Sequence, residues 1–300
     1  MRGLGLAIVF ALVPAAALAH AGHDHGAAYP WVWDWWITGP LLLTALLYAG
    51  GVLRLWHRAG LGRGVSAGRA ALFAAGWLAL AGALVTPLHP LGERLFTAHM
   101  VEHEILMVVA APLLALSRPV GAMLWGLPQP WRRGLGAAAG SPAWRRIWRG
   151  LTDPLAATVL HGVAIWAWHV PALFSAALND EGMHALQHLS FLVTTLLFWW
   201  SLLCRRCSRG VAVGHLFATA LHTGLLGALL VFSTRLWFPD QAGEAARWGL
   251  TALEDQQLAG LVMWIPACLA YPVAGLALAG LWIAGAGRRA GEARHAVEAR

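Results

Sequence analysis

The sequence contains no lysine, few charged residues and only three cysteines. Charged residues make up 12% of the 300 residues, about half of the ~25% found in soluble domains. Three cysteines exclude the disulfide framework of a small secreted domain. The chain also has no phosphate-binding glycine loop, dinucleotide fingerprint or nucleophile elbow. Because 59% of the residues are hydrophobic and the mean hydropathy is +0.61, the composition predicts an integral membrane protein. The missing nucleotide site and nucleophile–base pair favour a protein that is not an enzyme.

Long apolar segments account for most of this hydropathy. Each is close to the ~20 residues that a helix needs to cross a bilayer core. Seven are expected, over residues 37–56, 69–88, 97–116, 154–173, 184–203, 211–232 and 258–283. The fourth carries Pro171 near its end, and the seventh is long enough to tilt. The predicted fold class is an all-α membrane protein, a bundle of seven transmembrane helices over residues 37–283.

The N-terminus has the pattern of a secretory signal peptide. Arg2 precedes an apolar stretch that ends in Ala17-Leu-Ala19, so residues 1–19 are expected to be removed, the alternative being an uncleaved first span. Residues 20–36 then form a histidine-rich external segment with His20, His23 and His25. Its imidazoles and new α-amine suit copper(II), although such a tail can also be a polar segment without that role.

All 21 basic residues are arginines, and they are unevenly distributed among the loops. Seventeen lie on one side of the predicted spans: Arg54, Arg58, Arg63, Arg69, Arg118, Arg132, Arg133, Arg145, Arg146, Arg149, Arg205, Arg206, Arg209, Arg288, Arg289, Arg294 and Arg300. Only Arg94, Arg235 and Arg247 lie on the other side. The positive-inside rule therefore predicts a multi-pass protein of the inner cell membrane, with the mature N-terminus outside and a cytoplasmic tail at residues 284–300.

The isoelectric point near 10.6 does not indicate nucleic-acid binding, because the arginines stand in loops between apolar spans. The longest cytoplasmic loop, residues 117–153, alternates arginines with Trp131, Trp144 and Trp148. Such a segment is typical of an interface with anionic lipid. Membrane lipid is therefore an expected partner and nucleic acid is not, while the loop can alternatively dock a protein.

Two His-x-x-x-His pairs stand at the heads of two spans. His99 and His103 open the third span, and His184 and His188 open the fifth from the same side. Residues four apart share one face of a helix. Ionisable groups inside a bilayer are costly and indicate a functional site. We therefore expect the four imidazoles to bind one or two metal ions.

Copper is the expected metal, with zinc or haem as less favoured alternatives. Imidazole binds both copper and zinc, and the affinity order favours copper. Two facing helices can also supply the axial ligands of a haem, but paired histidines on one face suit a small ion better. His222, in the sixth span, and Asp255, at the head of the seventh, are further candidate metal ligands. Asp255 can alternatively complement the start of a helix.

Three other groups of polar residues have open interpretations. Glu102 and Glu104 flank His103, and either can orient an imidazole or complement the helix dipole. Cys204-Arg-Arg-Cys207 can pass a soft metal or consist of incidental surface thiols. His222, together with His161 and His215, can form a trail toward the cytoplasm, as a copper transporter would need.

Three motifs in order resemble CtaG, the family of caa-type cytochrome c oxidase assembly factors. They are Ala98-His-Met-Val-Glu-His103, His184-Ala-Leu-Gln-His-Leu-Ser-Phe191 and Asp255-Gln-Gln-Leu-Ala-Gly-Leu-Val-Met-Trp264. The resemblance covers roughly residues 35–283. It implies a seven-span assembly factor, without enzymatic activity, that acts on the oxidase subunit carrying the copper centre. A haem-binding electron carrier or a copper transporter is the alternative. The histidine-rich tail and the arginines between Cys204 and Cys207 are not features that the family implies.

Overall fold

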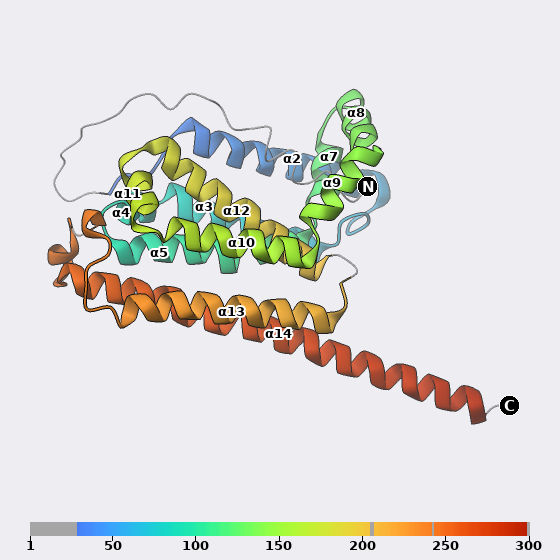
Figure 1. Ribbon diagram of the computed structural model, residues 1–300. Helices are drawn as coiled ribbons and strands as arrows, with labels where there is room; N and C mark the ends of the chain where they lie inside the picture. The colour runs from blue at the N-terminus through green and yellow to red at the C-terminus, as the bar shows by residue number, and fades with distance from the viewer. Residues whose placement is uncertain (1–28, 205–206, 242, 299–300) are drawn as a thin grey trace.

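The computed structural model describes residues 29–204, 207–241 and 243–298, and these residues form helices without any strand (Figure 1). Among them, six helices are long and apolar enough to cross a membrane. They are α2 (Trp35–Ala59), α3 (Ala67–Val85), the continuous helix Phe96–Ser117, α12 (Glu181–Leu203), α13 (Arg209–Val231) and α14 (Ala252–Glu298). The expectation of an all-helical membrane protein is confirmed. The signal peptide and His20, His23 and His25 lie outside the described residues.

The fourth expected span is bent. It consists of α10 (Pro154–Trp168) and α11 (Pro171–Asn179), whose axes differ by 76°, so a count of seven spans requires this pair to be one span. A residue before proline is pushed to an extended conformation, and Val170 has φ −71° and ψ 123°. The 15 residues of α10 are about 22 Å long, less than the ~30 Å of a bilayer core.

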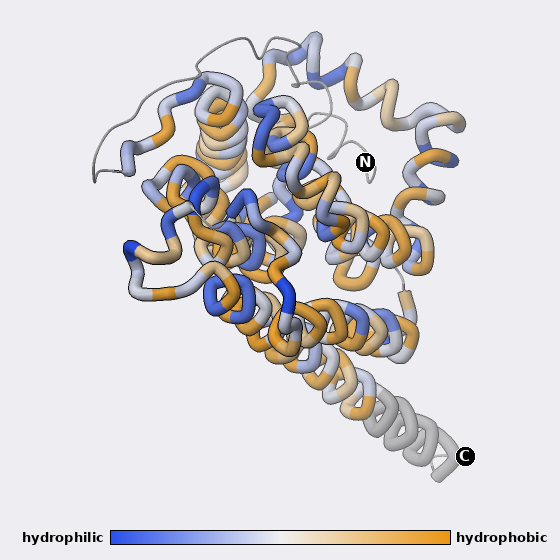
Figure 2. Tube along the Cα trace, turned by 60° about the vertical axis from the view of Figure 1, so that its left-hand side comes forward, coloured by the Kyte–Doolittle hydropathy of each residue, from blue (hydrophilic) through white to orange (hydrophobic). Residues whose placement is uncertain are grey.

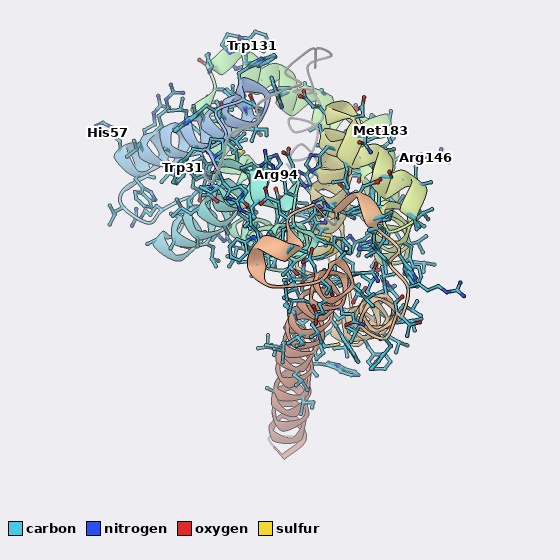
Figure 3. All side chains as sticks on the ribbon, turned by 90° about the vertical axis from the view of Figure 1, so that its left-hand side faces the viewer. Trp31, His57, Arg94, Trp131, Arg146 and Met183 are labelled. Carbon is cyan, nitrogen blue, oxygen red and sulfur yellow. The ribbon has the colours of Figure 1, made fainter. Side chains whose placement is uncertain are left out.

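Short helices cover the two ends of the bundle (Figure 1). One end carries α4 (Leu88–Gly92), α11 and the two 3-10 helices η2 (Pro239–Gln241) and η3 (Ala245–Trp248). The other end carries α7 (Val120–Gly126), α8 (Gln129–Gly140) and α9 (Pro142–Leu151). Figure 3 views the α4 end, with Arg94 near its centre. Most of the arginines of the basic loops thus lie at the end opposite α4.

The helices expose apolar side chains and bury polar ones. Leu46 on α2 is 70% exposed and Leu276 on α14 is 74% exposed. The hydropathy colouring of Figure 2 shows hydrophobic residues along much of the length of these helices. The buried polar residues, in contrast, include seven histidines: His89, His99, His103, His161, His169, His184 and His188. A surface of this kind is stable in lipid, while the buried polar groups indicate a functional interior.

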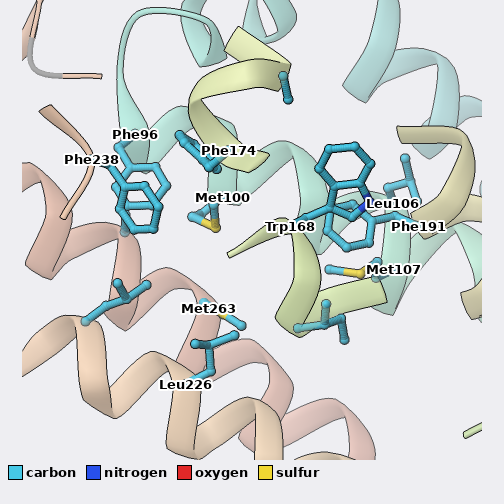
Figure 4. Close-up of a cluster of buried hydrophobic side chains, with 14 of the residues drawn as sticks. Phe96, Met100, Leu106, Met107, Trp168, Phe174, Phe191, Leu226, Phe238 and Met263 are labelled. Atoms are coloured by element: carbon cyan, nitrogen blue, oxygen red, sulfur yellow. The ribbon is translucent and has the colours of Figure 1, made fainter. Parts of the chain in front are cut away.

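Aromatic and methionine side chains form the apolar core beneath the α4 end (Figure 4). Phe96, Phe174 and Phe238 pack with ring centroids 4.6–5.2 Å apart. Met100, one turn after Phe96, is buried in the same cluster. This core joins the start of the third span to α11 and to the segment before η2. It thereby fixes the position of the neighbouring polar side chains on α5 (Phe96–Glu104).

The third span contains a π-helical turn, η1 (Ile105–Ala110), between α5 and α6 (Ala111–Ser117). The Ala111 amide donates to the Leu106 carbonyl, five residues back. The next amide position is Pro112, which has no N–H to donate, so the Met107 carbonyl has no donor within the helix. Thr195 Oγ1 and Trp199 Nε1 on α12 donate to it instead, at 3.2 and 3.0 Å. The wide turn therefore ties the third span to α12.

Candidate metal centre

Four imidazoles from α5 and α12 meet at the α4 end of the bundle. The ring centroids of His99 and His103 are 4.2 Å apart, and those of His184 and His188 are 4.5 Å apart. Between the helices, the His103–His188 distance is 5.1 Å and the His99–His184 distance is 5.8 Å. All four side chains are buried. The structure thus brings the two His-x-x-x-His pairs into one cluster.

The shortest contact between the two helices joins two ring nitrogens. His103 Nε2 lies 3.1 Å from His188 Nε2. Two nitrogens bound at about 2.0–2.1 Å to one tetrahedral ion lie roughly 3.3–3.4 Å apart. In the absence of an ion, the same distance suits a hydrogen bond in which one ring donates. The pair is therefore spaced to share either a proton or a metal ion.

A fully buried carboxylate lies beside this pair. Glu102 has an exposure of 0%, and its Oε1 lies 3.8 Å from His188 Nε2. The same oxygen contacts Nδ1 of His89, which comes from α4, at 2.7 Å. Burial lowers the pKa of His89, but the hydrogen bond and the charge of Glu102 outweigh it and leave the pKa raised. A buried carboxylate needs a positive partner, and a protonated His89 or a bound cation can serve.

A second group of ligand atoms also includes His89. The His89 ring stacks on His184, with centroids 5.3 Å apart and planes at 9°. Glu93, the residue that ends α4, places Oε1 4.0 Å from His184 Nδ1. Its side chain is 49% exposed, so this group lies nearer to the surface than Glu102.

Sequence reasoning left His89 without a role and did not single out Glu93. The available signal was the short connection between the second and third spans. A connection of this length holds its polar residues close to the heads of both spans. Gly92 makes the close approach possible, since a Cβ at this position would lie 3.1 Å from Glu102 Oε2 and 3.2 Å from the His99 Cα.

Several buried polar atoms of the cluster form no hydrogen bond among the described residues. They are both ring nitrogens of His99, Nδ1 of His103, Nε2 of His184 and Oε2 of Glu102. His169, the residue after α10, contacts Ile165 O through Nδ1 at 2.7 Å, and its Nε2 has no hydrogen-bond partner among the described residues. Since Ile165 O can only accept, His169 Nδ1 is the donor. Buried polar atoms are rarely unpaired, so this concentration of them favours a site that binds a cation or water.

Asp255 belongs to neither group of possible metal ligands and holds the start of α5. Its carboxylate accepts from the amides of Phe96 and Thr97 at 2.8 and 3.0 Å, and from Thr97 Oγ1 at 2.6 Å. Leu95, the residue at the N-cap position, has no side chain that can do this. Asp255 therefore caps a neighbouring helix and thereby positions the first turn before His99.

The other histidines singled out in the spans pair with residues of neighbouring helices. His222 Nδ1 accepts from Trp166 Nε1 at 3.4 Å. His161 and His215 contact Thr194 and Thr158, at 3.2 and 3.0 Å. These contacts join α10, α12 and α13 separately. They do not link the imidazole cluster into a continuous polar chain among the described residues.

The remaining candidate groups lie elsewhere. Glu104 is buried on α5, and its Oε2 has no hydrogen-bond partner among the described residues. Cys204, after the last residue of α12, donates through Sγ to Ala115 O at 3.2 Å. Among the described residues neither Cys204 nor Cys207 forms a disulfide, and both lie at the end of α12 opposite its histidines.

Comparison with known proteins assigns the chain to a family. Residues 46–284 match the family model described as cytochrome c oxidase caa3 assembly factor (Caa3_CtaG). Two uncharacterized proteins, Mb0105 of Mycobacterium bovis and MT0111 of Mycobacterium tuberculosis, are each 27% identical over 246 residues, which is 78% of this chain. The chain spans only 36% of the length of these relatives. No solved structure matches it. The family match covers most of the chain and agrees with the order of the three motifs, and the protein therefore belongs to the CtaG family of caa3-type cytochrome c oxidase assembly factors.

Proposed function

We propose that the protein binds copper at the outer face of the inner membrane and delivers it to the cytochrome c oxidase subunit that carries the copper centre. The observation that supports this most directly is the His103–His188 nitrogen pair, 3.1 Å apart beside the buried Glu102 carboxylate. Two imidazoles and one carboxylate are a common ligand set for a divalent metal. The family assignment supports cytochrome c oxidase as the recipient of the copper, because this oxidase must be supplied with copper during assembly.

Copper is preferred to zinc because imidazole ligands bind copper more tightly in the affinity order of divalent metals. The close packing of the cluster argues against haem. An iron atom between two axial imidazoles needs nitrogens about 4 Å apart with a porphyrin between them. In this cluster His99, Phe174 and Phe191 fill the space around the ring pair, with centroid distances of 4.2–5.2 Å.

The proposed topology counts α10 and α11 as one bent span, which gives seven. The α4 end then faces the outside, and α8, α9 and the C-terminus face the cytoplasm. The basic side chains of α8 and α9 support this orientation. The external His20, His23 and His25 would collect copper first and raise its concentration near the cluster by tethering.

The function is tested in cells that lack the protein but retain the caa3-type oxidase. Because the proposed defect is in metal supply, the oxidase should assemble with its haems but contain little copper and have low activity. Added copper should restore part of the activity. The measurements are the haem spectrum, the copper content and the oxygen consumption of the isolated oxidase. A normal copper content in the oxidase of these cells would contradict the proposal.

The topology is tested with reporters fused at two positions. A reporter that is active only outside the cytoplasm should be inactive after Arg300 and active when inserted in the segment between α13 and α14. The charge distribution is the physical reason, since arginine-rich loops remain inside. The opposite pair of results would reverse the orientation and place the imidazole cluster on the cytoplasmic side.

A further inference from the structure

Two overlapping sets of ligand atoms lie at the α4 end. In each set, the three atoms lie within 4.8 Å of one another. The inner set is His89, Glu102 and His188, and the outer set is His89, Glu93 and His184. Each set therefore consists of two imidazoles and one carboxylate, and His89 belongs to both.

The two sets differ in their access to water. Each set contains one carboxylate, but the two carboxylates differ in exposure. The Glu93 side chain is 49% exposed and the Glu102 side chain is 0% exposed. Taking a cation directly from water to a fully buried site requires the loss of its whole hydration shell in one step. A half-exposed carboxylate can replace part of that shell while the remaining waters stay bound.

His89 lies between the two sets. Its ring centroid is 5.3 Å from that of His184 and 5.5 Å from that of His188. Without an ion, its Nδ1 is hydrogen-bonded to Glu102. An ion that engages this nitrogen at the outer position must break the hydrogen bond, and the Glu102 carboxylate is then left free to receive the ion.

We propose that copper reaches the buried site through an outer site formed by His89, Glu93 and His184, and that His89 remains bound while Glu102 and His188 replace Glu93 and His184. Within these two sets the exchange needs two new ligands rather than three, and one carboxylate accompanies the positive charge at both positions. His103 Nε2, 3.1 Å from His188 Nε2, then adds a further ligand at the inner position. This inference rests on the proposed copper-binding function and assigns Glu93 a role in loading rather than in equilibrium binding.

The test compares the rate of copper loading with the final amount of copper bound. The purified full-length protein is mixed with copper(II) as its weak glycine complex, excess chelator is added after increasing times, and protein-bound copper is counted. Glu93→Gln should slow loading about tenfold, because an exposed carboxylate acts mainly on the association rate. Its final stoichiometry should equal that of the wild type, and Glu93→Asp should restore most of the rate.

Glu181→Gln is the matched control, because Glu181 lies in the first turn of α12 and contributes to the charge around Glu93. Glu181 is outside both ligand sets, so the loading rate of Glu181→Gln should stay within about twofold of the wild type. Wild-type loading by Glu93→Gln would overturn the outer site but leave the proposed function standing. If Glu93→Gln bound less copper than the wild type at the end of loading, Glu93 would contribute to equilibrium binding, and the proposal that it acts only in loading would be wrong. A wild-type protein that binds no copper would overturn the proposed function itself.

Discussion

Replacing His103 or His188 by alanine is expected to abolish tight copper binding while the helices remain inserted in the membrane. Each substitution removes one of the two nitrogens that lie 3.1 Å apart and leaves the other without its partner. Loss of one of three or four ligands should weaken copper binding by more than about 100-fold, since even the residues that only support metal ligands contribute 10–100-fold. Copper is counted in the purified protein after dialysis against a weak chelator.

His57→Ala is a suitable control for this experiment. His57 lies in the last turn of α2, is exposed, and is at the opposite end of the bundle from α4. The His57→Ala variant should therefore bind as much copper as the wild type. If His103→Ala and His188→Ala also retained full copper, the ion would have to bind outside the imidazole cluster, and the proposed site would be wrong.

Asp255→Ala is expected to reduce both thermal stability and copper binding. The substitution removes a carboxylate that accepts from the Phe96 amide, the Thr97 amide and the Thr97 hydroxyl. The loss should cost about 2–4 kcal/mol, as for a buried helix cap with charge-assisted hydrogen bonds. The unfolding midpoint in detergent should fall by roughly 5–10 °C. Copper affinity should fall as well, because the first turn of α5 positions His99 and His103.

Two further variants separate capping from metal ligation at Asp255. Glu254→Gln changes the neighbouring exposed carboxylate, which accepts from Thr251, the residue just before α14, and should leave both properties close to the wild type. Asp255→Asn keeps one side-chain oxygen as an acceptor, so its midpoint should lie between those of the wild type and Asp255→Ala. A variant that loses copper without any loss of stability would instead indicate that Asp255 is a ligand.

The spans were predictable because hydropathy is a local property. Six expected segments coincide with apolar helices to within a few residues at most boundaries. The bend at Pro171 was visible as a proline, but its angle depends on how α11 packs through Phe174 beneath the imidazoles. Local sequence indicates a break in a helix, whereas tertiary contacts determine the direction of the chain after it.

The candidate site was only partly predictable. Four-residue spacing placed His99 beside His103 and His184 beside His188, since helix geometry alone determines those neighbours. The role of His89 depends on the fold of α4 over α5, and no periodicity in the sequence encodes it. Asp255 shows a similar limit. A carboxylate at the head of one helix was recognisable as a cap, but the helix that it caps is 158 residues away in the chain.

The π-helical turn in the third span has a consequence for comparing members of this family. A wide turn holds one residue more than an α-helical turn would, and each residue turns an α-helix by about 100°. Removing a single residue between Ile105 and Ala110 would leave the hydropathy of the span nearly unchanged. Because the wide turn accommodates that residue, its removal would restore an ordinary α-helical turn and leave the turns that carry His99 and His103 in the same orientation relative to the half that packs through Ala111 and Ala115. In an alignment of relatives, a gap of one residue at this point would therefore mark chains that lack the wide turn and its tie to α12 but still direct both histidines toward that helix.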